Sequence, residues 1–188
     1  IVVPGYLTCP RVCGAIFQGV AQLINQIKLD FGKDYKVLVV SFDHEDTAER
    51  AAKKKSEFFE KLIIDTPDQS AWRFLVGNQD NIRDLMSQLG FRYFKDGEEF
   101  AHSAALYVLT PDGKISQYFS DVSFKSFDVK LALLEAADGK VGTFLDQALV
   151  YCFRFDPTKG KYIWVVNGAL KMGGALTLFF LGIFMFCL

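Results

Sequence analysis

Two cysteines stand close together near the start of the chain, in the segment Thr8-Cys9-Pro10-Arg11-Val12-Cys13-Gly14. A largely apolar run, residues 1–7, precedes the pair, and apolar residues follow it at helical spacing from Ile16 to Ile27. The pair is therefore expected on a strand-to-helix turn. Backbone N–H groups and the helix dipole at such a turn favour a thiolate over a thiol. Two thiolates can exchange disulfides or bind a soft metal ion.

The elements that must position these cysteines alternate between strand and helix. The apolar pattern predicts strands over residues 1–7, 37–40, 72–76, 104–109 and 115–119. It predicts helices over residues 14–29, 47–62, 79–89 and 127–137, with a loop over 91–101. This order indicates an α/β fold, thioredoxin-like, in which helices flank a central mixed sheet. The cysteine turn and the loops that follow the strands then share one edge, where open α/β sheets bind ligands.

Only two histidines occur in the sequence, and both are expected in loops. His102 precedes the strand over residues 104–109, and in a thioredoxin-like fold that position lies beside the cysteine turn. Two thiolates and one imidazole suit Cu(I), or Cu(II) with a further ligand, and zinc could use the same donors. We therefore predict a metal site formed by Cys9, Cys13 and His102. His44 follows the second strand and is interpreted as part of a solvated helix start.

Composition excludes several other classes of protein. The chain has 188 residues, a formal net charge of −1 and four cysteines. Near-neutral charge without a basic stripe does not favour nucleic-acid binding, and four cysteines are too few for a disulfide scaffold of this size. Cys152 and Cys187 are interpreted as structural.

The end of the chain differs in character from the rest. Residues 172–188 contain no charged side chain and are rich in Phe, Leu, Gly and Ile, at the short limit of a membrane-spanning helix. Tyr162 and Trp164 would suit the membrane interface. We expect three parts: a copper-binding domain over residues 1–140, a linker over 141–161 and a transmembrane anchor over 162–188.

Three segments together point to a protein family more specifically than the cysteine pair alone: Cys9-Pro10-Arg11-Val12-Cys13, Val39-Val40-Ser41-Phe42-Asp43, and the run from His102 to Lys114. Their order and spacing, over roughly residues 1–137, resemble the Sco/SenC family of copper chaperones, in a form with a carboxyl-terminal membrane anchor. The resemblance implies a thioredoxin fold that binds copper through Cys9, Cys13 and His102. It also implies that the chain serves the copper-bearing subunit of a respiratory cytochrome oxidase.

By the same resemblance, the domain is expected on the extracytoplasmic side of the membrane, either the bacterial periplasmic face or the mitochondrial intermembrane space. The basic residues that precede the expected span argue for the opposite side: Arg154, Lys159, Lys161 and Lys171. We assume that an amino-terminal export signal overrides this local charge bias.

Two alternatives to a copper carrier remain open at this point. The first is a thiol–disulfide oxidoreductase with Cys9 as nucleophile and Cys13 as resolving cysteine. The second is an accessory structural subunit of a respiratory complex. Disulfide exchange needs no imidazole at position 102, and thioredoxins have two residues between their cysteines instead of three. We therefore expect a metallochaperone rather than an enzyme.

Overall fold

The structure of the chain is a computed structural model. It describes residues 1–9, 12–64, 68–138, 153–156, 161–164, 171, 173–178 and 182–183. The central sheet has five strands in the order β3-β2-β1-β6-β7. These strands are β1 (Val2–Gly5), β2 (Val37–Ser41), β3 (Trp72–Leu75), β6 (Leu106–Leu109) and β7 (Ile115–Phe119). The helices α1 (Val12–Gln26), α2 (Ala48–Phe59), α3 (Gln79–Gln88) and α4 (Ser126–Ala136) lie between or after them.

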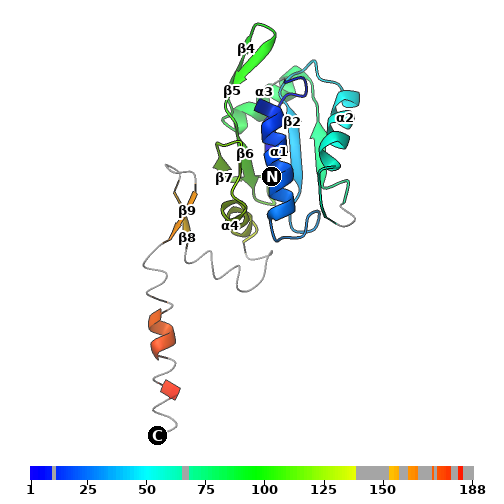
Figure 1. Cartoon of the computed structure of the whole chain (residues 1–188). Coiled ribbons are helices and arrows are strands. Elements are labelled where there is room, and N and C mark those ends of the chain that lie inside the picture. The colour runs from blue at the N-terminus through cyan, green and yellow to red at the C-terminus, as the bar shows by residue number, and fades with distance from the viewer. Residues whose placement is uncertain are drawn as a thin grey trace.

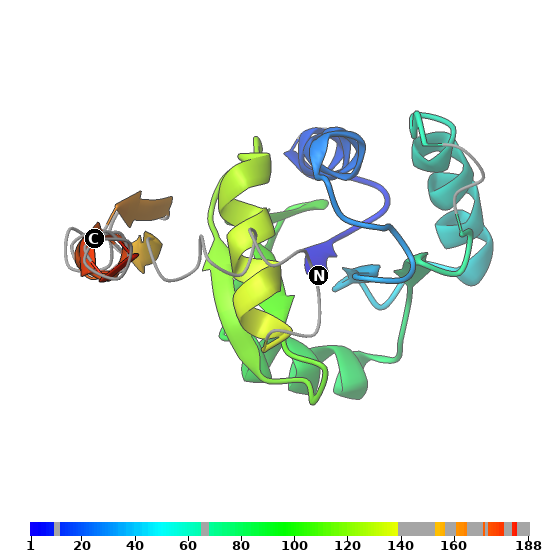
Figure 2. The ribbon, with the colours of Figure 1, turned by 90° about the horizontal axis from the view of Figure 1, so that it is seen from below.

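The sheet is mixed, with both parallel and antiparallel pairs of strands. β1, β2 and β3 run parallel and are joined through α1 and α2, whereas β6 is antiparallel to both β1 and β7. Figure 1 shows α1 in front of the sheet, and Figure 2 shows α1 and α3 on opposite sides of it. α2 contacts β3 and α1, and α4 contacts β6 and β7. The predicted mixed sheet flanked by helices is confirmed.

The core lies between β1, β2 and β6 and the helices that cover them. Val3, Val37, Val39 and Leu106 have no exposed surface, which fits the continuous apolar runs of strands buried on both faces. The helix starts also follow their sequence signals. Thr47 and Asn78 are the N-caps of α2 and α3, and each side chain accepts a hydrogen bond from a backbone N–H three residues later.

Residues 91–101 are not the loop that the sequence pattern suggested. β4 (Tyr93–Asp96) and β5 (Glu99–His102) form an antiparallel hairpin with a sheet of its own, and Tyr93 pairs with His102. The turn between them uses Gly97 at φ +64°, a conformation that glycine adopts without steric cost. Figure 1 shows this hairpin projecting beyond the end of the main sheet. His102 therefore occupies the last position of a strand, not a loop.

A second hairpin follows the α/β part, formed by β8 (Phe153–Asp156) and β9 (Lys161–Trp164). Tyr162 is buried against α4, where its backbone N–H donates to Asp128 Oδ1 at 3.1 Å and its hydroxyl donates to Glu135 Oε2 at 2.6 Å. Residues 161–164 therefore form a strand. Residues 162–164, the first three of the expected anchor over 162–188, belong to this strand.

Of the apolar segment 172–188, the structure describes only residues 173–178 and 182–183, which are helical and exposed. The remaining residues of that segment lie outside the described residues. Within the described part of the chain, none of the helices has the length and apolar character needed to cross a membrane.

Candidate metal centre

The cysteine turn joins the carboxyl end of β1 to the start of α1. Cys13 lies in the first turn of α1 with 1% of its surface exposed, whereas Cys9 is half-buried and precedes the helix. No disulfide joins the two sulfurs. Close packing beneath the turn depends on Gly5, because a Cβ there would come within 2.8 Å of Phe17 Cζ and 3.6 Å of Cys13 Sγ.

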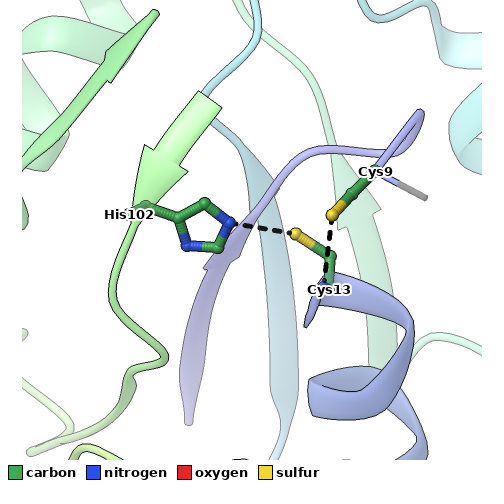
Figure 3. Close-up of side chains that lie close together, drawn as sticks. All are labelled: Cys9, Cys13 and His102. Atoms are coloured by element: carbon green, nitrogen blue, oxygen red, sulfur yellow. Dashed lines mark hydrogen bonds between the residues drawn. The ribbon is translucent and has the colours of Figure 1, made fainter. Parts of the chain in front are cut away.

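Three side chains with metal-binding atoms converge at this turn. The sulfur atoms of Cys9 and Cys13 and a ring nitrogen of His102 all lie within 4.8 Å of one another. Cys13 Sγ is 3.5 Å from His102 Nε2, although 89 positions separate the two residues in sequence, and the Cys13 N–H donates to Cys9 Sγ at 3.4 Å. Figure 3 shows the imidazole pointing from the end of β5 toward the two sulfurs. The structure brings together the three residues that the sequence selected.

A hydrogen bond at the second ring nitrogen of His102, Nδ1, sets the orientation of the imidazole. His102 Nδ1 is 3.0 Å from the carbonyl oxygen of Ser103, so an Nδ1–H donates there and leaves the Nε2 lone pair facing the sulfurs. A hydrogen bond of this kind fixes the tautomer of metal-ligating histidines. Sequence reasoning missed this contact, because a backbone carbonyl carries no residue-type signal.

An aromatic cluster holds the hairpin and its histidine against the sheet. It consists of Tyr6, Phe42, Phe91, Tyr93 and Phe100. The His102 ring contacts Phe42 at a centroid distance of 5.0 Å and Tyr6 at 5.9 Å, both edge to face. Edge-to-face pairs are favourable beyond the surface that they bury. This cluster positions His102 although β5 does not join the main sheet.

A buried carboxylate ties the cysteine turn to the loop after β2. Asp46 Oδ2 accepts hydrogen bonds from the Leu7 N–H at 2.7 Å and from the Ser41 hydroxyl at 2.6 Å. Asp46 Oδ1 accepts from Arg50 at 3.1 Å, and the Asp46 side chain has no exposed surface. Asp46 therefore fixes the backbone two residues before Cys9.

The electrostatics of the turn differ from the expectation for a helix start. Burial raises the pKa of the Cys13 thiol above its ordinary value; the Tyr6 N–H lowers this pKa, and the nearby Cys9 and Asp46 raise it by smaller amounts. The prediction that the helix start makes this residue a thiolate is therefore wrong for Cys13. Burial and the hydrogen bond to Cys9 likewise raise the pKa of Tyr6 to about 12. A metal ion must displace the Cys13 proton when it binds.

Comparison with known proteins gives the family. A profile described as SCO1/SenC matches residues 1–130. The chain belongs to the SCO1/SenC family. No curated protein matches this chain.

Solved structures share the fold of this SCO1/SenC chain. One is a proposed electron transfer protein from Aquifex aeolicus VF5, with 24% identity and a TM-score of 0.65 over 74% of this chain and 78% of that one. Another is ScoI from Arabidopsis thaliana with copper bound, with 22% identity and a TM-score of 0.53 over 64% of this chain and 74% of that one. The thioredoxin-like arrangement predicted from the element order agrees with these neighbours.

The donor set of this SCO1/SenC chain fits a copper ion. Soft sulfur ligands select Cu(I), and an imidazole nitrogen suits both copper oxidation states. Cys9, Cys13 and His102 would hold such an ion, since the 3.5 Å between Cys13 Sγ and His102 Nε2 is short enough for both atoms to bind the same metal.

The metal site opens into a cavity of about 580 Å³, here called the thiol cavity. Besides Cys9 and His102, it is lined by Tyr6, Phe100, Ala101 and three carboxylates of the β4–β5 hairpin, Asp96, Glu98 and Glu99. Cys9 is thus accessible from solvent, whereas Cys13 lies behind it.

The other candidate residues do not join the three donors. His44 is exposed in the turn after β2 and is not a member of the cluster of potential metal ligands. Cys152 and Cys187 lie outside the described residues.

Proposed function

We propose that this chain binds one copper ion through Cys9, Cys13 and His102 and passes it to a partner protein. The observation that carries this proposal is the convergence within 4.8 Å of two sulfurs and one imidazole nitrogen from segments 89 residues apart. A cysteine pair alone would serve disulfide exchange equally well. The histidine, oriented by Ser103 and by the aromatic cluster, adds a nitrogen ligand atom, which metal binding uses and disulfide exchange does not.

The destination in this proposal is the copper site of a respiratory cytochrome oxidase, to which the chain delivers copper or which it prepares for copper. Membership of the SCO1/SenC family supports this, and so does the copper-bound state of the Arabidopsis ScoI that shares the fold. The half-buried Cys9 at the mouth of the thiol cavity supports a transfer role, because an incoming ligand could reach a metal ion from that side.

Copper titration of the reduced chain tests the binding step. We expect saturation near one equivalent and X-ray absorption with both sulfur and nitrogen neighbours. Cys9→Ser, Cys13→Ser and His102→Ala should each weaken copper binding by at least about tenfold. His44→Ala, which removes the histidine outside the cluster, is the matched control and should leave the affinity unchanged. Full copper affinity after loss of either cysteine would refute the proposal.

The second candidate function is thiol–disulfide exchange with the same cysteines. A half-buried Cys9 in front of a buried Cys13 favours it, since the accessible thiolate would attack a partner disulfide and the inner thiol would then resolve the mixed disulfide. The products would be a reduced partner and a Cys9–Cys13 disulfide. Exchange with a model disulfide that persists in His102→Ala, together with absent copper binding in the parent chain, would favour this alternative.

We also propose that the carboxyl-terminal segment anchors the domain to a membrane, with the copper site on the extracytoplasmic side. Residues 172–188 carry no charge. Leu176 and Leu178 have 62% and 73% of their surface exposed, as expected for side chains that would contact lipid in a membrane. Because Tyr162 packs on α4, a spanning helix would begin after Trp164.

Protease treatment of intact spheroplasts tests the sidedness. Digestion of the domain before the membrane is breached is the expected result. Protection of the domain until lysis would place it on the cytoplasmic side and would refute the oxidase destination.

A further inference from the structure

A second cavity, here called the cationic cavity, is lined by residues of the β4–β5 hairpin, of the segment that follows β2 and of the first half of α3. Its volume is about 420 Å³, within the range of small-molecule sites. It contains none of the three predicted metal ligands. The lining residues are Phe42, His44, Gln79, Ile82, Arg83, Tyr93, Phe94, Lys95 and Phe100.

The apolar part of this lining suits a planar ring. Phe42, Tyr93 and Phe100 belong to the aromatic cluster and form a preorganised wall, because each packs against another ring of that cluster. Phe94 has 65% of its surface exposed, which is unusual for a large aromatic side chain. A ring that entered the cavity would cover part of this exposed surface.

The polar part of the lining suits a negative charge. Arg83 and Lys95 are cations, and Gln79 is the first residue of α3, where backbone N–H groups lack partners within the helix. Arg83 already pairs with Asp80 at 2.6 Å, but a guanidinium has five donors and this pair is exposed to solvent. His44 adds an imidazole at the rim.

The charged side chains that line the two cavities differ in sign, although Asp80 pairs with Arg83. The thiol cavity is lined by Asp96, Glu98 and Glu99, whereas the cationic cavity is lined by Arg83 and Lys95 and contains no carboxylate. An organic anion should therefore enter the cationic cavity rather than the thiol cavity.

We propose that the cationic cavity is a binding site for a small planar aromatic carboxylate, with the ring against Phe42, Tyr93 and Phe100 and the carboxylate toward Arg83 and Lys95. This goes beyond copper transfer and does not depend on it. The site adjoins the metal centre, because Phe42 lines the cavity and also contacts the His102 ring.

Titration of the reduced, copper-free full chain with 2-naphthoate tests the proposal, with 2-naphthamide as an uncharged probe of the same shape. Binding is read from the imidazole NMR signals of the two histidines, one in the cavity and one across its aromatic wall. We expect saturable shifts at His44 that exceed those at His102, and an affinity for the amide at least about tenfold lower. Each of Arg83→Gln and Lys95→Gln should weaken naphthoate binding by about threefold to tenfold and leave amide binding unchanged.

The matched control is Lys114→Gln, which makes the same change of charge on an exposed side chain beyond the cavity lining. It should alter neither affinity. Larger shifts at His102 than at His44, equal affinities for the two probes, insensitivity to both cavity substitutions, or no saturation at about 10 mM would each overturn the proposal. Because copper is absent throughout, the outcome is independent of the copper titration.

Discussion

The backbone N–H of Leu7 donates to the carboxylate of Asp46 at 2.7 Å, and this bond ties the cysteine turn to the loop that follows β2. Two further donors, Ser41 and Arg50, share the same carboxylate. The turn that carries Cys9 is therefore held by a side chain that is not itself a metal ligand.

Asp46→Ala should lower the free energy of unfolding by about 3 kcal/mol, because it leaves the buried Leu7 N–H and Ser41 hydroxyl without their acceptor. Urea denaturation measures this loss, and copper competition should show weaker binding by the destabilised turn. Asp30→Ala is the control, since it removes only an exposed pair with Lys33 and should change stability by less than about 0.5 kcal/mol. Equal effects of the two substitutions would contradict the anchoring role of Asp46.

Gly5→Ala should destabilise the fold by about 1–3 kcal/mol, since its new methyl group would come within 2.8 Å of Phe17 Cζ. It should also disturb the position of Cys13. Gly14→Ala provides the comparison, because a Cβ there meets no atom within 4 Å and an alanine in α1 should stabilise by about 0.5–1 kcal/mol. Thermal unfolding of both variants decides the matter. A tolerated alanine at position 5 would show that Phe17 moves aside.

The reduced, metal-free chain should lose stability as pH rises above about 9. Burial keeps the Cys13 thiol protonated in the folded state, whereas the unfolded thiol ionises near its ordinary pKa of 9.0. The stability that comes from the raised pKa of Cys13 is therefore fully present below that pH and is lost above it. The free energy of unfolding then falls by up to about 1.4 kcal/mol per pH unit. Burial also raises the pKa of Tyr6 to about 12 and raises that of Tyr35, so further loss follows above pH 10.

Denaturant titrations between about pH 8 and pH 11 measure this dependence, with Cys13→Ala as the diagnostic variant. The variant should keep the later loss that comes from the tyrosines and should lack the earlier one. If the parent and Cys13→Ala show the same slope near pH 9, the raised pKa of Cys13 is not the cause.

Tyr162→Phe should weaken the attachment of the β8–β9 hairpin to α4 by about 1 kcal/mol, because the hydroxyl donates to Glu135 at 2.6 Å. Hydrogen exchange in residues 153–156 and 161–164 should accelerate. Tyr118→Phe is the control, since that side chain has 48% of its surface exposed on β7. Unchanged exchange in Tyr162→Phe would show that apolar packing alone holds the hairpin.

The sequence contained enough information for the main sheet, since buried strands, caps and the β6–β7 turn each have local signals. Residues 37–40 of the strand β2 are a continuous apolar run, and Asn78 caps α3 as its residue type suggests. The β4–β5 hairpin was missed because its strands are short and largely polar. The one available signal was Gly97, because glycine at the first position of a two-residue turn favours a tight hairpin.

The three proposed ligands could also be selected from residue type and order. Their support could not be predicted, because it comes from residues without chemistry of their own at the site. The Ser103 carbonyl orients the imidazole, Phe42 supports its ring, and burial reverses the expected pKa shift of Cys13. Each of these depends on tertiary contacts that no local pattern encodes.

The β4–β5 hairpin forms a sheet of its own, so the imidazole and the two sulfurs belong to units that can separate. Opening the hairpin breaks contacts in the aromatic cluster but no backbone ladder of β1, β2 or β6. Local openings of this kind need less free energy than global unfolding. His102 would therefore be the one donor of the three that can leave the site while the main sheet stays folded, with Cys9 and Cys13 remaining at the turn after β1.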